Sequence, residues 1–265
     1  MSGLPVVTAT RYVAPLREGG SLPGIVETDD LGTYVCKFRG AGQGLGVLVA
    51  EVIVGELART LGIRTPDLVG IELAEGIARY EADEEVQDLL RASLGLNLGV
   101  DFLPGSFGFD PSIEVDADTA GRILWLDAFV ANVDRSWRNP NLLVWHGNVW
   151  AIDHGASLYF HHAWSGGVPD PVPLAAQRWA EQPWSADDHV LRAHVDAVAD
   201  VADELAAAVT DEVLERVTAL VPDEWLVGPP TPDNLPPDEL RAAYRAFLRA
   251  RLDGSRSWLP QRSAA

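Results

Sequence analysis

Short stretches in which apolar and polar residues alternate are concentrated in the first third of the chain, and such alternation is typical of half-buried β-strands. Turn-forming residues separate the stretches, as at 28–32. Pro104 and Gly105 end the last of them. The pattern predicts strands at 11–16, 25–27, 33–38, 68–73 and 100–103.

Elsewhere, apolar residues recur at the spacing of amphipathic helices. The strands come mostly first and the helices later, which indicates an α+β protein with a β-rich N-lobe (1–104) and a helical C-lobe (105–265). A β-hairpin is expected at 142–152. Helices are expected at 45–61, 83–94, 117–133, 186–221 and 237–253.

Composition and charge exclude several classes of protein and of binding partner. The 265 residues are 47% apolar and 22% charged, which excludes a disordered or fibrous protein. The net charge of −19 makes nucleic acids and anionic membrane surfaces unexpected partners. No apolar run approaches the roughly 18 residues of a membrane helix, and the N-terminus lacks a signal-peptide pattern. With Cys36 as its one cysteine, the protein is expected to be cytoplasmic.

Lysine occurs once, at position 37, although the chain has 19 arginines. Lys37 follows an apolar strand, and Glu51 lies in a helix that is apolar around most of its circumference (47–54). A carboxylate in such a helix is destabilising unless it is paired. A strand lysine paired with a helix glutamate is the arrangement that anchors phosphates in protein kinases. Glu56 is a second candidate partner, and the alternative is that Lys37 and Glu51 are both solvated.

The predicted hairpin brings polar residues at its two ends together. Pairing of 142–145 with 149–152 would place Asn141 opposite Asp153, with their Cβ atoms about 5 Å apart. An amide oxygen and a carboxylate at that separation suit Mg²⁺. Asp134, in the preceding loop, would be free to orient an attacking hydroxyl. The alternative is that these are ordinary loop and turn residues.

Several segments resemble motifs of HipA-like kinases. Asn-Val-Asp-Arg at 132–135, Asn-Leu-Leu-Val at 141–144 and Ile-Asp-His-Gly at 152–155 resemble the catalytic and metal-binding segments of that family. The Asp-Arg and Asp-His-Gly pieces are also similar to phosphatidylinositol 4-kinases. Tyr-Val-Cys-Lys-Phe at 34–38 resembles the family's strand lysine, and the resemblance spans 17–160.

The resemblance implies a bilobal protein-kinase-like fold that binds ATP between its lobes together with Mg²⁺. Phe102 and Leu103 would lie near the adenine. Lys37, held by Glu51, would contact the phosphates. The residues that weakly resemble a phosphate-binding loop are Gly19, Gly20 and Ser21.

The resemblance also implies which residues bind the metal and act on the acceptor, and the chain departs from the family pattern at one point. Asp153 and an asparagine would hold Mg²⁺, and Asp134 would position or deprotonate the acceptor hydroxyl. The family's Asp-Gly-His-x-x-Asn is replaced by Asp-Arg-Ser-Trp-Arg-Asn at 134–139, so the histidine is missing. Asn139 has the family's spacing, whereas Asn141 enters the strand. The expected hairpin pairing ranks Asn141 first as metal ligand.

The reaction implied is transfer of the γ-phosphoryl group of ATP to a protein serine or threonine or to a small-molecule hydroxyl. One alternative is a catalytically silent nucleotide-binding or interaction module, suggested by the missing histidine. The retention of Lys37, Asp134 and Asp153 argues against it. The other is a phosphoinositide-type lipid kinase, which the net charge of −19 disfavours.

Overall fold

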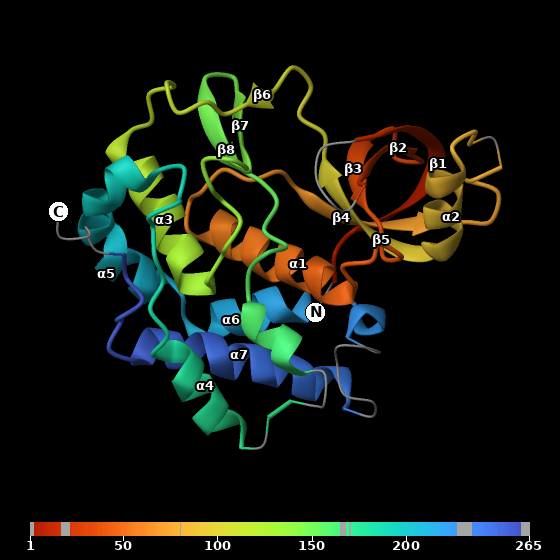
Figure 1. Ribbon diagram of the computed structural model, residues 1–265. Coiled ribbons are helices and arrows are strands. Elements are labelled where there is room, and N and C mark those ends of the chain that lie inside the picture. The colour runs from red at the N-terminus through yellow and green to blue at the C-terminus, as the bar shows by residue number, and fades with distance from the viewer. Residues whose placement is uncertain are drawn as a thin grey trace.

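The computed structural model describes residues 3–16, 22–79, 81–164, 168–169, 171–226 and 235–260 (Figure 1). Five strands close into a barrel in the order β1-β2-β3-β5-β4, in which β1 and β4 are parallel and the other neighbours antiparallel. The strands are β1 (Val6–Pro15), β2 (Gly24–Thr28), β3 (Thr33–Lys37), β4 (Leu68–Leu73) and β5 (Gly95–Asp101).

Alternate side chains of the barrel strands point into its interior, as the two-residue period of a strand requires. Val26 on β2 and Tyr34 on β3 are buried there. Helix α2 (Glu84–Ala92), which lies against the barrel in Figure 1, contributes Val86 and Leu90 to the same core. The barrel therefore has a hydrophobic core of its own.

Helix α1 (Leu45–Thr60) connects β3 to β4 and is buried along most of its length. Its apolar residues share a core with the later helices rather than with the barrel interior, and Figure 1 shows it lying among α3 and α6. The later helices, here called the helical part, are α3 (Ala117–Val130), α4 (Val172–Ala180), α5 (Val198–Ala208), α6 (Asp211–Ala219) and α7 (Pro237–Asp253), with 3-10 turns η1 (Tyr159–Trp164), η2 (Arg192–Ala197) and η3 (Asp223–Trp225).

The 3-10 turn η3 links the helical part to the barrel. The indole N–H of the buried Trp225 donates to the Leu96 carbonyl on β5 at 3.0 Å. The neighbouring Glu224 pairs with Arg39, which follows β3. These contacts, together with α1, fix the barrel against the helices.

The predicted α+β class is confirmed, since the strands of the barrel precede most of the helices. The element boundaries differ. The helix expected at 186–221 is divided into η2, α5 and α6, because His194 has a non-helical backbone and the Thr210 side chain caps a new helix. Helix α4 was not predicted, and the division into lobes at residue 104 stays a prediction. No helix in the described ranges has both the length and the apolarity to cross a bilayer.

A second, three-stranded sheet consists of β6 (Phe107–Gly108), β7 (Leu142–Trp145) and β8 (Asn148–Ala151). Leu142 pairs with Ala151 and Trp145 with Asn148, so the predicted register is wrong by one residue.

The turn explains the register. His146 and Gly147 both have left-handed backbones, with φ of 47° and 74°, and form a two-residue turn whose twist matches that of the strands. Asn148 is therefore part of β8, and Asn141 lies opposite Ile152 instead of Asp153, its carbonyl accepting the Ile152 N–H at 3.1 Å.

The turn predicts the effect of a glycine substitution. Gly147→Ala should lower the free energy of unfolding by about 1 kcal/mol, because alanine is strained in a left-handed conformation. Urea unfolding measures the change. The control is Gly42→Ala, where an added Cβ meets open space and φ is not left-handed. Equal losses in the two variants would contradict the turn assignment.

Candidate functional site

The ammonium group of Lys37, at the end of β3, lies between two carboxylates. It donates to Oδ1 of Asp153 at 2.7 Å and also to Oε1 of Glu51 on α1. The side chains of Lys37 and Glu51 are 13% and 3% exposed, whereas Asp153 is 48% exposed. The expected ion pair with Glu51 is thus present. Glu56, the other candidate partner, pairs with Arg59 at 3.3 Å.

The three groups set one another's protonation. Burial alone would lower the pKa of Lys37, but the two carboxylates outweigh it and raise that pKa above its usual value. Lys37 in turn holds the pKa of Asp153 well below its usual range. Burial raises the pKa of Glu51 although Lys37 opposes the shift. Lys37 is therefore cationic and Asp153 ionised at neutral pH.

Gly155 allows α1 to approach the segment after β8. A Cβ at this position would lie 3.0 Å from Oε1 of Glu51 and 2.5 Å from Cγ1 of Val47. A larger residue would push Glu51 away from Lys37. The close approach accounts for the glycine in the Asp-His-Gly sequence.

Asp134 is contacted by both candidate asparagines. The side-chain amides of Asn139 and Asn141 donate to its Oδ2, at 2.8 and 3.1 Å. Asn141 is buried at the start of β7, whereas Asn139 is exposed. The sequence offered the two residues as alternatives for one role, and the structure brings both to the same carboxylate.

Behind Asp134 lies a buried ionic cluster that the sequence analysis missed. Asp127 of α3 accepts from Nε of Arg135 at 2.6 Å, from Nε2 of His189 at 3.0 Å and from Nδ2 of Asn132 at 2.9 Å. Burial would raise the pKa of Asp127, but Arg135 and His189 outweigh it and hold that pKa well below its usual range. The carboxylate is therefore ionised and fully paired.

A sequence signal for this cluster exists. Asp127 stands among apolar residues of a helix, just as Glu51 does, and a carboxylate in that setting needs a cationic partner. The partner's identity is not readable from the sequence, because Arg135 follows the end of the helix and His189 comes from a distant segment. Burial and Arg135 lower the pKa of His154 to about 3, which leaves that imidazole neutral.

The residues expected near the adenine follow β5. The Phe102 N–H donates to the Thr33 carbonyl at 3.1 Å, and Leu103 is buried. Lys37 lies four residues from Thr33 on β3, so Phe102 is about 13 Å away along the strand. Trp145 of β7 donates to the Pro104 carbonyl at 3.0 Å, which ties this connection to the hairpin. Gly19, Gly20 and Ser21 lie outside the described residues.

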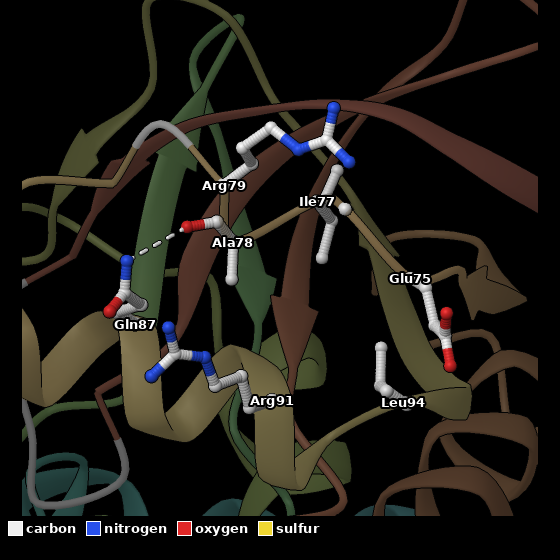
Figure 2. Close-up of a pocket in the computed structure, with 8 residues that line it drawn as sticks. Glu75, Ile77, Ala78, Arg79, Gln87, Arg91 and Leu94 are labelled. Carbon is white, nitrogen blue, oxygen red and sulfur yellow. Dashed lines mark hydrogen bonds between the residues drawn. The ribbon is translucent and has the colours of Figure 1, made fainter.

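A cavity of about 570 Å³ lies elsewhere, between the turn at 75–79 and α2 (Figure 2). Gln87 donates to the Ala78 carbonyl there at 3.3 Å. Figure 2 shows the guanidinium groups of Arg79 and Arg91 pointing in different directions, so no charged groups converge in it. The residues around Lys37 and Asp134 are the stronger functional candidates.

The Asp127 cluster predicts a pH-dependent stability. Asp127→Asn should lower the free energy of unfolding by about 3–5 kcal/mol at pH 7, because the buried Arg135 loses its counter-charge. The folded pKa of Asp127 is depressed, so its contribution is present above about pH 3.9, the unfolded pKa, and is lost as the pH falls below it. Urea unfolding should therefore show that the difference in free energy of unfolding between the wild type and Asp127→Asn becomes smaller from pH 7 to pH 3. The control is Asp118→Asn on the exposed side of α3, where little change is expected.

Comparison with known proteins gives a family and several distant structural neighbours. A search of curated proteins finds no match. Among solved structures, the proinflammatory kinase CtkA of Helicobacter pylori is 10% identical over 97% of this chain and 95% of its own, with a TM-score of 0.49. The Golgi casein kinase is 12% identical over 96% and 72%, with a TM-score of 0.39. Its Mn/ADP-bound structure is 11% identical over 97% and 75%, with a TM-score of 0.38.

The family is identified by the sequence, because the model of the HipA-like kinase family matches residues 10–242, most of the chain. The predicted resemblance is confirmed, and the chain belongs to the HipA-like kinase family of phosphotransferases.

Proposed function

We propose that this protein is an ATP- and Mg²⁺-dependent kinase that transfers the γ-phosphoryl group to the hydroxyl of a protein serine or threonine or of a small molecule. The observation that carries the proposal is the placement of Lys37. Its ammonium group contacts both the buried Glu51 and the half-exposed Asp153. A cation held in this way, beside a half-exposed carboxylate, is suited to contact phosphate oxygens.

The nucleotide would lie along β3 and the connection after β5. Lys37 would contact its phosphates, and Glu51 would keep the ammonium in place. Phe102 and Leu103, about 13 Å along the strand from Lys37, would contact the adenine. The nucleotide would thus extend along β3, with its phosphates at Lys37 and its adenine at the connection after β5.

A divalent cation fits the donor set. Asp153 offers an ionised, half-exposed carboxylate, and Asn141 donates through Nδ2 to Asp134, which leaves Oδ1 as the atom that would bind the cation. No three Asp, Glu, His or Cys side chains gather into an ion site within the described ranges, so phosphate and water oxygens would complete the coordination. When bound, Mg²⁺ neutralises charge on the phosphates.

Asp134 would act on the acceptor. The acceptor oxygen forms a bond to the γ-phosphorus while the bond from that phosphorus to the β,γ-bridging oxygen breaks, releasing ADP. The hydroxyl proton passes to the Asp134 carboxylate. Because Asn139 and Asn141 both donate to Oδ2, Oδ1 is the oxygen that would accept the proton.

One observation favours nucleotide binding without transfer. The amides of Asn139 and Asn141 both occupy Oδ2 of Asp134, so only Oδ1 is left to face an acceptor. A silent module would bind Mg-ATP through Lys37 and Asp153 and would show no turnover. The experiments below separate this alternative from the kinase.

Removal of the Asp153 charge should abolish metal-dependent nucleotide binding. Mg-ATP should raise the melting temperature of the wild type through binding linkage, and Asp153→Asn should lose most of that rise. Thermal shift with ATP, with and without Mg²⁺, measures it. The control is Asp200→Asn on α5, an exposed position outside the site. A full Mg-ATP shift in Asp153→Asn would exclude the metal assignment.

The same assay distinguishes the two asparagines. Asn141→Ala should lose more of the Mg-ATP shift than Asn139→Ala, because Asn141 is buried and its carbonyl accepts the N–H of Ile152, the residue before Asp153. A greater loss at Asn139 would reverse the assignment.

Loss of Asp134 should leave binding and remove transfer. Asp134→Ala should keep the Mg-ATP shift, while ADP formation and autophosphorylation fall by about 10²–10⁴-fold, the usual contribution of a general base. Mass spectrometry of protein and nucleotide after incubation measures both. Turnover equal to that of the wild type would contradict the role of Asp134. A wild type that binds Mg-ATP without turnover would favour the silent module.

A further inference from the structure

Arg135 is a buried arginine next to Asp134. Its side chain is 1% exposed, and every nitrogen of its guanidinium group has a partner. Burying a guanidinium group costs free energy, which this set of partners offsets. Its contacts show which segments it connects.

One nitrogen joins the two strands of the hairpin. Nη1 donates to the Asn141 carbonyl and, at 3.1 Å, to the Ile152 carbonyl. These residues lie opposite each other just beyond the last β7–β8 pair, Leu142 with Ala151. The guanidinium group therefore bridges the open end of the hairpin, at Asn141 on one side and at Ile152, the residue before Asp153, on the other.

Asn141 and Asp153 need such support. Both have left-handed backbones, with φ of 47° and 55°, a conformation that residues other than glycine adopt only where the surroundings impose it. The left-handed turn takes each side chain out of the strand alternation. A fixed carbonyl beside each residue limits how far these turns can relax.

The other nitrogens extend the contact to Asp134. Nη2 faces Nδ1 of His154 at 3.3 Å, and Nε donates to Asp127. Asp127 also accepts from Asn132, whose Oδ1 accepts the Asp134 N–H at 3.0 Å. One guanidinium thus contacts the hairpin end directly and reaches Asp134 through Asp127 and Asn132.

We propose that Arg135 is a positioning residue that sets the spacing of Asp134, Asn141 and Asp153, and with it the affinity of the site for Mg²⁺ and the rate of transfer. The inference rests on the proposed function. Lysine cannot replace Arg135, because an ammonium group is a single point of charge and cannot span two strands and a carboxylate in the way a planar fork does.

The test compares Arg135→Lys with a matched control, Arg251→Lys. Arg251 is also buried and donates to three carbonyls, those of Trp179, Gln182 and Ala128, at 3.0, 3.2 and 2.8 Å, but it lies among α3, α4 and α7. Both variants lose a buried fork and are expected to melt at lower temperature. Only the Arg135 variant disturbs the hairpin end.

Two measurements are made on each folded variant, at equal intervals below its melting temperature. The Mg²⁺ concentration for half-maximal ATP turnover should rise at least tenfold, with a lower kcat, in Arg135→Lys and change less than twofold in Arg251→Lys. Amide hydrogen exchange should quicken in residues 139–156 for Arg135→Lys and around 176–184 for Arg251→Lys. Binding of ATP without Mg²⁺ should be equal in both.

Should Arg135→Lys fail to fold, the double variant Arg135→Gln with Asp127→Asn replaces it, because it removes both buried charges together. The same changes are expected. Unchanged Mg²⁺ dependence, or unchanged exchange at 139–156, in a folded variant would overturn the proposal. A wild type with no Mg-dependent nucleotide binding would instead overturn the proposed function, and the exchange comparison alone would then decide whether Arg135 fixes these segments.

Discussion

The ammonium group of Lys37 joins three parts of the chain at one point. Lys37 ends a barrel strand, Glu51 lies on a helix that belongs to the other hydrophobic core, and Asp153 follows the hairpin. Because an unpaired charge at the position of Glu51 is strongly destabilising, the barrel cannot move away from α1 without breaking the pair. The contact that places the Lys37 ammonium group therefore also helps to hold the barrel against α1.

The hairpin depends on a smaller constraint, the left-handed turn at His146 and Gly147. That turn sets the register so that Asn141 meets Ile152. Asn141 and Asp153 do not face each other across the sheet, and both have left-handed backbones. The positions of their side chains therefore do not follow from the alternation of residues along the two strands.

The sequence predicts those features that depend on one residue in an unusual setting. A single lysine among arginines and a carboxylate in an apolar helix identify Lys37 and Glu51, and strands followed by helices give the α+β class. The hairpin register was missed, because it depends on whether Asn148 belongs to the turn or the strand. The Asp127 cluster was missed, because His189 is brought in by tertiary packing that no local pattern records.

The two ionic clusters differ in a way that suits different tasks. Asp127 and Arg135 are 0% and 1% exposed, so their contacts cannot be exchanged for water or ligand without unfolding the surroundings. Asp153 is 48% exposed, and under the proposed function its bond to Lys37 would be exchanged for a phosphate oxygen on one side and a cation on the other. A site that must bind and release a charged substrate needs an exchangeable pair. Such a site also needs a buried ion pair that stays in place, such as Asp127 with Arg135, because an exchangeable pair cannot keep its geometry while its partners change.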